Sequence, residues 1–327
     1  MKKNVVVIAG GNSSEYGISI QSGNYVYAEI DGERYNKYLM ILKGRDWHVQ
    51  WNGKEYAVDR NDFSFECEGE KISFDFAYIT IHGNPGENGM LQGYLDMMGV
   101  PYSTCSTLCE ALTFDKYTCT NYLQAFGIRT TNPVLLLRGK AYDKDALLRA
   151  VGLPCFVKPN AEGSSFGVSK VKTAEAFDEA LALAFGKCKE VLVEAFLDGT
   201  EFTCGLYRAG DKKVIFPVAE VVPKKEFFDF EAKYDAKMSD EIIPGRFSDE
   251  ITEKIQEMAS EVYDILRCEG IIRMDGFVCG DEVIMLEVNT TPGMTANSFI
   301  PKMVRAMGSD LQGILTEIIE DKLVRVF

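Results

Sequence analysis

Acidic and apolar side chains alternate in two neighbouring segments, IIRMDGFVCG (271–280) and EVIMLEVNT (282–290). This alternation predicts two antiparallel strands joined by a short turn. Side chains two apart share a face, and we expect one polar face to carry Arg273, Asp275, Phe277, Met285, Glu287 and Asn289. A three-residue turn would pair Asp275 with Glu287, Phe277 with Met285 and Arg273 with Asn289. A two-residue turn would break that match.

Two carboxylates directly opposed on a sheet lie roughly 4.5–5.5 Å apart and repel, so they need a cation or water. Mg²⁺ prefers hard oxygen ligands, and Asn289 would add a carbonyl oxygen to Asp275 and Glu287. The alternative is a solvated acidic hairpin in which Arg273 is a surface counter-ion. The apolar part of this face is either core or one wall of a pocket for a nucleotide base.

A glycine- and serine-rich loop, NAEGSSFG (160–167), follows a short apolar strand that ends at Lys158. Small residues such as Gly163, Ser164 and Ser165 let backbone N–H groups approach a polyanion, and the lysine adds positive charge. The loop is neither a P-loop nor a GxGxxG fingerprint. Taken alone, the loop fits an ordinary flexible turn better than a phosphate site. Together with the carboxylate pair, it indicates a nucleoside triphosphate bound with magnesium.

Two further segments allow either a functional or an ordinary surface interpretation. Glu201 follows the apolar strand VLVEAF, where a carboxylate can accept hydrogen bonds from ribose hydroxyls. The stretch EFFDFEAKY (226–234) mixes aromatic and charged residues without a clear period. Such a segment suits either a lid that excludes water or a surface loop.

Size and charge limit the classes of protein that fit. A chain of 327 residues with net charge −14 and a pI near 4.8 suits an α/β enzyme of two or three subdomains and argues against nucleic acid or an acidic membrane surface as a partner. The first apolar run is too short for a signal peptide, and no stretch reaches the roughly 18–20 apolar residues of a membrane span. We therefore expect a soluble, cytoplasmic protein.

The nine cysteines are scattered singly, and their number and context point to reduced thiols. The close pair Cys105 and Cys109 suits one helix face better than a metal site. With only two histidines, a metal should be a hard cation held by carboxylates.

The elements that must position these residues follow from the apolar runs. VVVIAGG (5–11) predicts a strand and a glycine turn, followed by a helix that begins near Glu15 and can be capped by residues 12–14. A second strand, 74–82, ends at His82 and leads through GNPGENG into a helix at 90–98. An open α/β sheet binds ligands at the carboxyl ends of its strands, which is where Glu15 and His82 fall.

A helical region at 108–126 marks a plausible domain boundary. Beyond it we expect helices at 174–185 and 249–267 and strands at 156–158, 168–171, 191–195, 203–207, 215–221, 271–279 and 283–289.

These segments, in this order, resemble the D-alanine–D-alanine ligase family of the ATP-grasp superfamily. The motifs that carry the resemblance span nearly the whole chain: AGGNSSE, HGNPGENGMLQGYLDMMGVPY, FDKYTC, VKPNAEGSSFGVSKV, VLVEAFLDGTEFT, FFDFEAKY, IIRMDGF and LEVNTTPGMTANS. The resemblance implies an α/β (α+β) ATP-grasp fold preceded by an N-terminal open α/β domain. It further implies a substrate-binding domain at 1–104, a central ATP-grasp subdomain at 105–193 and a C-terminal subdomain with metal and catalytic residues at 194–327.

The resemblance also assigns roles to individual residues. It implies an ATP site that comprises Lys116, Lys158, Ser164, Ser165, Glu194, Ala195, Leu197, Glu201 and Lys233, beside Phe277 and Met285. Two Mg²⁺ or Mn²⁺ ions would be held by Asp275, Glu287 and Asn289. The first D-alanine would meet Glu15 and His82, and the second would meet Ser298. Arg273 and the Gly293 N–H would stabilise the oxyanion, and Ser164 and Tyr234 would tie a lid to Glu15.

The activity implied is the ATP-dependent joining of two D-alanine molecules through a D-alanyl phosphate, for peptidoglycan precursors, by a homodimer. Tyr234 favours an amine as acceptor. Phe299 stands where the family commonly has a smaller aliphatic residue, so D-serine remains an alternative acceptor. A non-catalytic nucleotide-binding regulator is the alternative from another class.

Overall fold

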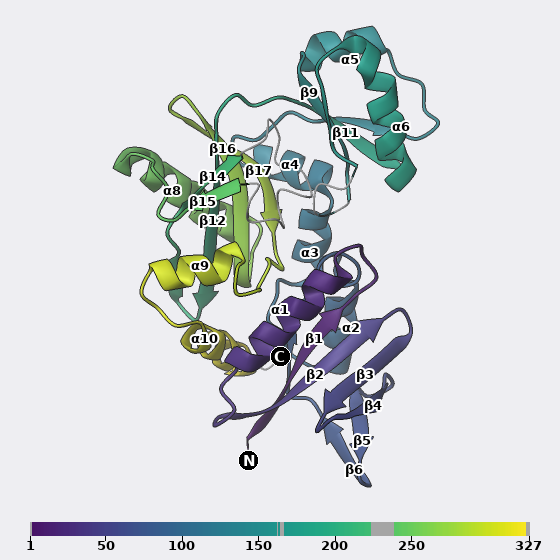
Figure 1. Cartoon of the computed structure of the whole chain (residues 1–327), viewed down its shortest axis with the longest axis vertical. Coiled ribbons are helices and arrows are strands. Elements are labelled where there is room, and N and C mark those ends of the chain that lie inside the picture. Colours follow the sequence, from purple (N-terminus) through teal and green to yellow (C-terminus); the bar gives the residue numbers. More distant parts are fainter. Residues whose placement is uncertain (1, 162, 164–166, 224–238, 325–327) are drawn as a thin grey trace.

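The computed structural model describes residues 2–161, 163, 167–223 and 239–324 (Figure 1). Its strands form three sheets of seven, four and six strands. The helices are α1 (Tyr16–Glu29), α2 (Met90–Met98), α3 (Thr107–Phe114), α4 (Lys116–Gln124), α5 (Lys144–Val151), α6 (Phe177–Lys187), α8 (Asp249–Ile265), α9 (Phe299–Ala306) and α10 (Leu311–Val324), with a 3₁₀ turn at Ala174–Ala176.

The first sheet has a parallel centre and an antiparallel edge. Its order is β6 (Glu70–Ser73), β5 (Ser64–Cys67), β4 (Lys54–Asp59), β3 (Asp46–Trp51), β2 (Tyr35–Lys43), β1 (Lys3–Gly10) and β7 (Phe76–Ile79). β1 pairs in parallel with β2 and with β7. Val5 and Val7 belong to one core cluster and Val6 and Ile8 to another, all at 0% exposure. The apolar run of β1 is therefore explained by burial of both faces.

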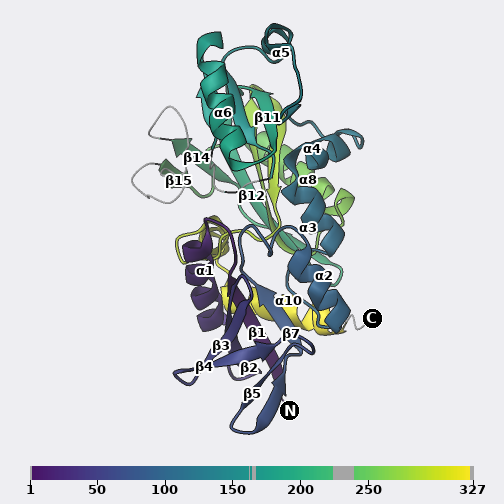
Figure 2. The same ribbon diagram turned by 90° about the vertical axis from the view of Figure 1, so that its right-hand side faces the viewer.

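The second sheet is antiparallel, with the order β10 (Ser169–Val171), β9 (Cys155–Pro159), β11 (Glu190–Ala195) and β8 (Val134–Leu137). Apolar residues of α5 and α6, such as Leu147 and Phe177, share a core cluster with Val157 and Val193 of this sheet. The unit lies at the end of the molecule farthest from the N-terminal sheet (Figure 2).

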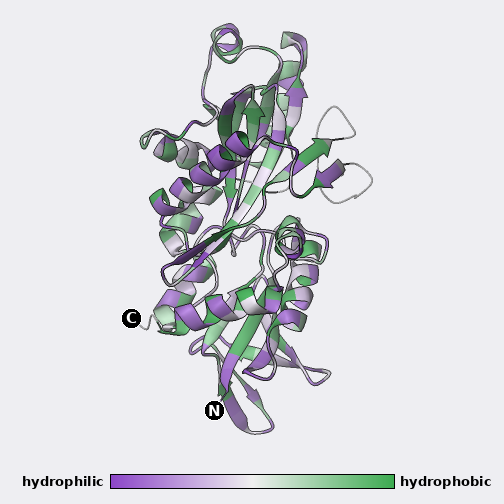
Figure 3. Cartoon of the chain, turned by 90° about the vertical axis from the view of Figure 1, so that its left-hand side faces the viewer, coloured by the Kyte–Doolittle hydropathy of each residue, from purple (hydrophilic) through white to green (hydrophobic). Residues whose placement is uncertain are grey.

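The third sheet has the order β15 (Ser239–Ile242), β14 (Ala219–Pro223), β12 (Thr200–Ala209), β16 (Gly270–Cys279) and β17 (Glu282–Asn289), and β13 (Lys212–Ile215) pairs with β12. One face packs against α8, since Phe202, Leu206 and Ile272 join Ile255 and Val262 in a core cluster. In Figure 3 the strands are largely hydrophobic, while the covering helices alternate between hydrophobic and hydrophilic residues.

Helices α9 and α10 join the third sheet to the first. Ile300 and Met303 of α9 and Leu315 and Ile318 of α10 lie in the same cluster as Val5 and other residues of the N-terminal sheet. This packing joins the second face of the third sheet to the N-terminal unit.

The structure corrects three predictions about elements. The strand expected at 215–221 is two strands, β13 and β14, separated by a break that contains Pro217, which cannot donate to a ladder. The helical region 108–126 is also two helices, because Asp115 leaves the helical conformation and its carboxylate caps α4 through the Thr118 N–H. Cys105 precedes α3 rather than sharing a helix face with Cys109. Within the described part of the chain, none of the helices has the length and hydrophobicity of a membrane-spanning segment.

Candidate active site

The polar face predicted for the C-terminal hairpin lies on the side of the third sheet opposite α8. Arg273, Asp275 and Phe277 alternate with core residues of β16 such as Met274, which is fully buried. On β12, Thr203 pairs with Asp275 and Glu201 pairs with Phe277. Cross-strand partners share a face, so this face of the sheet gathers the predicted polar residues.

The register between β16 and β17 combines a correct and a wrong prediction. Asp275 pairs with Glu287 and Arg273 pairs with Asn289, as predicted. The turn nevertheless holds only two residues, 280 and 281, and Phe277 pairs with Ile284 instead of Met285. A β-bulge restores the match, because Leu286 is an extra residue on β17 between the two parts of the ladder.

The bulge changes the surroundings of the neighbouring side chains. Met285 pairs with Gly276 and is 1% exposed in the core cluster that includes α8 residues. Its predicted place beside Phe277 on the polar face is therefore wrong. Leu286 and Glu287 are both only partly buried, so the bulge leaves two consecutive side chains off the core.

The carboxylate of Asp275 is surrounded by donors. The Arg273 guanidinium donates from Nε at 2.8 Å and from Nη2 at 2.7 Å, and the Asn289 amide donates at 2.9 Å. The Thr203 hydroxyl donates as well. Across the ladder, Glu287 Oε2 lies 3.8 Å from Lys116 Nζ at the start of α4. Cationic side chains thus offset the repulsion expected between the two opposed carboxylates.

The chemistry of these donors fits a divalent cation. Two carboxylates and a carboxamide on adjacent strands provide hard oxygen ligands, which Mg²⁺ and Mn²⁺ prefer. Rotation of the Asn289 carboxamide would present its oxygen in place of the amide nitrogen. Arg273 donates two hydrogen bonds to the Asp275 carboxylate and balances its negative charge. A bound cation would take over part of this role of Arg273.

A buried ion pair stands on the second sheet. Lys158 Nζ lies 2.6 Å from Glu194 Oε2, with side chains 10% and 4% exposed. The other carboxylate oxygen of Glu194 accepts a hydrogen bond from the Thr131 hydroxyl at 3.0 Å. Beyond Glu194, Ala195 is exposed and Leu197 is half-buried. This strand therefore presents apolar atoms next to a lysine held in place by a carboxylate.

The glycine–serine loop reaches the N-terminal unit. A Cβ added to Gly163 would lie 2.3 Å from Oε2 of Glu15, which is 8% exposed. Only a glycine allows this approach of the loop to the carboxylate. Glu15 immediately precedes α1, and its N–H donates to Ser13 Oγ at 3.2 Å, while Ser13 Oγ donates to the His82 carbonyl at 2.7 Å. The predicted proximity of Glu15, His82 and this loop is thus present.

His82 connects the N-terminal sheet to the loop that follows β17. Its Nδ1 lies 3.0 Å from the Thr291 carbonyl, and its Nε2 lies 3.3 Å from Ser22 Oγ on α1. Ser22 Oγ also accepts the Met294 N–H at 3.3 Å. Burial lowers the pKa of His82, against the opposing effect of Glu15. Burial therefore favours the neutral imidazole. His82 contacts the chain before Gly293 through Thr291, and Ser22 contacts the chain after it through Met294.

Gly293 and Ser298 are adjacent in space. A Cβ on Gly293 would lie 3.0 Å from Ser298 Oγ. That hydroxyl accepts the Thr295 N–H at 3.0 Å and lies 2.8 Å from Thr295 Oγ1. The Arg273 guanidinium carbon lies 5.7 Å from the centre of the Phe299 ring. The loop 290–298 thus brings Gly293 and Ser298 together, and the next residue, Phe299, lies beside Arg273 of β16.

Sequence reasoning missed several residues of this site, and Glu87 is the clearest. Burial and the nearby Glu15 carboxylate raise the pKa of Glu87 to about 8, against the effects of the Gly83 N–H, Lys116 and Arg273. Its Oε2 accepts that N–H at 2.6 Å. Its signal was a carboxylate in the same glycine-rich loop as His82. Thr203 and Ser22 carried no comparable signal, because hydroxyl residues in apolar elements are common.

Four predicted residues lie outside the described part of the chain: Ser164, Ser165, Lys233 and Tyr234. The same holds for the segment 227–234 expected to act as a lid.

The three sheets, with an N-terminal α/β unit followed by two further units, define an ATP-grasp fold preceded by an open α/β domain. A family model described as "D-ala D-ala ligase C-terminus" matches residues 122–320, and one described as "D-ala D-ala ligase N-terminus" matches residues 4–105. The chain belongs to the D-alanine–D-alanine ligase family.

Individual relatives agree with this assignment. A D-alanine–D-alanine ligase of Bacteroides fragilis is 52% identical over 324 residues, which cover 98% of this chain and 100% of the relative. A D-Ala:D-Ser ligase structure from Enterococcus faecalis is 30% identical with a TM-score of 0.85, covering 98% and 99% of the two chains. A D-alanine–D-alanine ligase of Bacillus anthracis complexed with ATP is 30% identical with a TM-score of 0.80, covering 99% and 98%.

Proposed function

We propose that this protein joins two D-alanine molecules into D-alanyl-D-alanine at the expense of ATP, in the cytoplasm and as a homodimer. The observation that supports this most directly is the convergence of three units on one site. Glu15 meets the loop at Gly163, and His82 bonds to the loop at Thr291, which follows the acidic ribbon. The subdomain boundaries at 104 and 193 remain part of this proposal.

In the first step, the carboxylate of the first D-alanine attacks the terminal phosphate of ATP, and a D-alanyl phosphate and ADP form. Phosphoryl transfer requires placement and charge neutralisation, which Lys116, Lys158 and Lys233 would supply. Glu201 would accept hydrogen bonds from the ribose, and the strand at 194–197 with Phe277 would line the base. Mg²⁺ or Mn²⁺ at Asp275, Glu287 and Asn289 would screen the phosphate charge.

In the second step, the amine of the second D-alanine attacks the acyl carbon, and phosphate leaves. Arg273 and the Gly293 N–H would stabilise the oxyanion, and Ser298 would bind the carboxylate of the acceptor. Glu15 would hold the ammonium group of the first substrate and His82 would lie near its carboxylate. Since Arg273 makes two bonds to Asp275, we expect it to turn toward the oxyanion only when that carboxylate has another partner.

The lid would protect the intermediate. Water hydrolyses an acyl phosphate, so closure over the site favours transfer to the amine. Tyr234 and Ser164 would link the lid to Glu15 in this closed state.

The acceptor is tested by product analysis. ADP release and product mass are measured with D-alanine alone, and then with D-serine or D-lactate in competition. We expect ADP release with D-alanine and D-alanyl-D-alanine as the main product in every mixture. A mixed product with D-serine as the main species would assign the alternative acceptor, and nucleotide binding without ADP release would refute ligase activity.

A further inference from the structure

Three buried thiols meet beneath the junction of the N-terminal and C-terminal units. Their Sγ atoms all lie within 4.8 Å of one another, and the residues are 0%, 2% and 4% exposed in the order Cys105, Cys109 and Cys268. They come from the segment before α3, from α3 itself and from the connection between α8 and β16. Positions far apart in the sequence therefore converge on one point that the proposed ligase reaction does not use.

We propose that Cys105, Cys109 and Cys268 form a binding site for a monovalent thiophilic cation, copper(I). Thiolate ligands select soft metals such as copper(I) and zinc. A structural zinc site is almost always four-coordinate. The described residues provide three sulfur atoms here, with no fourth Cys, His, Asp or Glu ligand atom in the same group. A three-coordinate soft ion fits this set better than zinc.

The separation of the sulfur atoms supports a metal rather than a disulfide. Metal–sulfur bonds of about 2.3 Å put the sulfurs of a three- or four-coordinate site roughly 3.8–4.0 Å apart. Cys109 Sγ and Cys268 Sγ are 3.8 Å apart, and no pair exceeds 4.8 Å. The sulfurs therefore need to move by less than about 1 Å to bind a metal. A disulfide, at about 2.05 Å, would require a larger approach.

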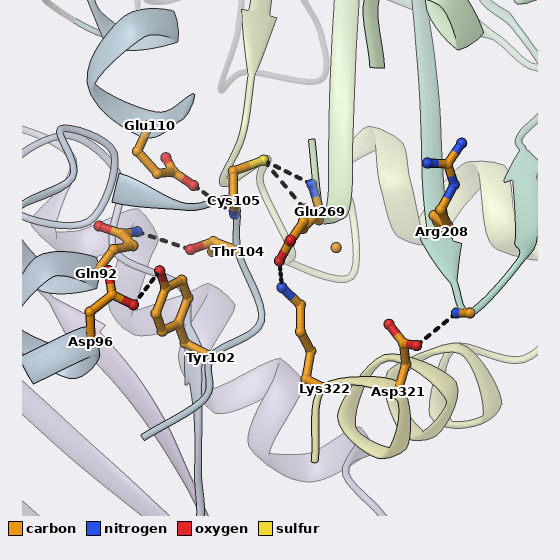
Figure 4. A network of polar contacts seen from close by, with 12 residues as sticks. Gln92, Asp96, Tyr102, Thr104, Cys105, Glu110, Arg208, Glu269, Asp321 and Lys322 are labelled. Atoms are coloured by element: carbon orange, nitrogen blue, oxygen red, sulfur yellow. Dashed lines mark hydrogen bonds and ion pairs between the residues drawn. The ribbon is translucent and has the colours of Figure 1, made fainter. Parts of the chain in front are cut away.

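The backbone around the three thiols is already held in position, as Figure 4 shows for Cys105. The Cys105 N–H donates to the buried carboxyl of Glu110 at 3.0 Å, and its Sγ lies 3.3 Å from both the N and the O of Glu269. The Cys268 N–H donates to the Tyr263 carbonyl at 2.8 Å. Second-shell contacts of this kind orient the ligands of a metal site.

Copper(I) binds cysteine sulfur as the thiolate, so binding displaces a thiol proton to solvent. A single thiolate balances one monovalent charge. Any further thiol protons displaced by the cation pass to solvent.

A partly exposed side chain lies next to the cluster in the chain. Glu269 follows Cys268 directly, its side chain is 39% exposed, and it forms an ion pair with Lys322 of α10.

Copper(I) binding by the whole protein, measured without oxygen against a copper(I) chelator, tests the site. We expect about one copper per wild-type chain and at least about a tenfold weaker affinity for Cys109→Ser, since even second-shell changes cost 10–100-fold. Cys155→Ser is the matched control, because Cys155 is a fully buried thiol in another cluster. A Cys188→Ser/Cys279→Ser double variant controls for the half-buried thiols. Both controls should bind as the wild type does.

Three results would overturn the proposal: unchanged affinity in Cys109→Ser, loss of binding in the Cys188→Ser/Cys279→Ser variant, or tighter retention of zinc than of copper. If Cys109→Ser does not fold, hydrogen exchange of the wild type decides. Copper should slow exchange in α3 and at residues 266–270 and leave the second sheet unchanged. No local slowing there would equally refute the site.

Discussion

The ion pair between Lys158 and Glu194 makes a quantitative prediction about stability. The two side chains are 10% and 4% exposed and their charged atoms lie 2.6 Å apart. Glu194→Gln would keep the volume and the contact with Thr131 but leave the lysine charge unpaired. Removing one partner of a buried pair costs about 3–5 kcal/mol. Because the lysine keeps some access to water, we expect the lower end, about 3 kcal/mol.

Scanning calorimetry at one fixed heating rate measures this effect. For a chain of this size, 1 kcal/mol corresponds to about 2 °C, so Glu194→Gln should lower the Tm by roughly 6 °C. The double variant Glu194→Gln/Lys158→Met removes both charges and should recover most of that loss. ATP should also reduce the deficit of the single variant, if its phosphates meet Lys158. A Tm loss below about 2 °C, or a double variant no more stable than Glu194→Gln, would refute the reasoning.

Three further predictions concern other parts of the molecule. Glu287→Gln should abolish dipeptide formation, measured by ADP release. It should change the free energy of unfolding by less than about 1 kcal/mol, because the ion pair of Glu287 with Lys116 is partly exposed. Full activity of the variant would contradict the metal assignment. Burial, and to a smaller extent the Glu15 carboxylate, raises the pKa of Glu87 from 4.5 to about 8. Between these two pH values the folded protein keeps a proton on Glu87 that the unfolded chain has lost. The resulting stabilisation is therefore present below pH 4.5 and declines as the pH rises toward 8. The Tm of the wild type should therefore fall relative to that of Glu87→Gln between pH 5 and 8. If the Tm values of the two proteins change with pH in parallel, the raised pKa of Glu87 is wrong. Gly205→Ala would place a Cβ 2.5 Å from Ile300 Cδ1 and should cost about 1–3 kcal/mol in urea unfolding, whereas Gly186→Ala on α6, with open space around its Cβ, should not destabilise.

The alternation of residue types along the sequence predicted most of the side chains that the third sheet contributes to the site. The alternation in β16 assigns Arg273, Asp275 and Phe277 to one face because side chains alternate strictly along a strand. The pairing of Asp275 with Glu287 was correct for a different reason than the one given. A two-residue turn shifts the ladder by one position, and the bulge at Leu286 shifts it back. The two-residue turn did have a sequence signal, because Gly280–Asp281 is typical of short hairpin turns. The bulge at Leu286 had no comparable signal.

Contacts between distant segments could not be predicted in the same way. The thiols of Cys109 and Cys268 meet because α3 packs beside the connection between α8 and β16, and no local spacing in the sequence predicts that packing. The hydrogen bonds of His82 to Ser22 and Thr291 likewise depend on how α1 and the 290–298 loop approach each other. The resemblance to a family assigned a role to His82. The apolar pattern of the sequence by itself predicted only that His82 lies at the end of a strand.

The shared core of β1 and α10 has a consequence for biosynthesis. Val5 and Val7 pack in one cluster with Leu315 and Ile318, although β1 ends at Gly10 and α10 begins at Leu311. A ribosome adds about 5–20 residues per second, so β1 is synthesised roughly 15–60 s before α10. Until then the part of this cluster that α10 covers is available to chaperones.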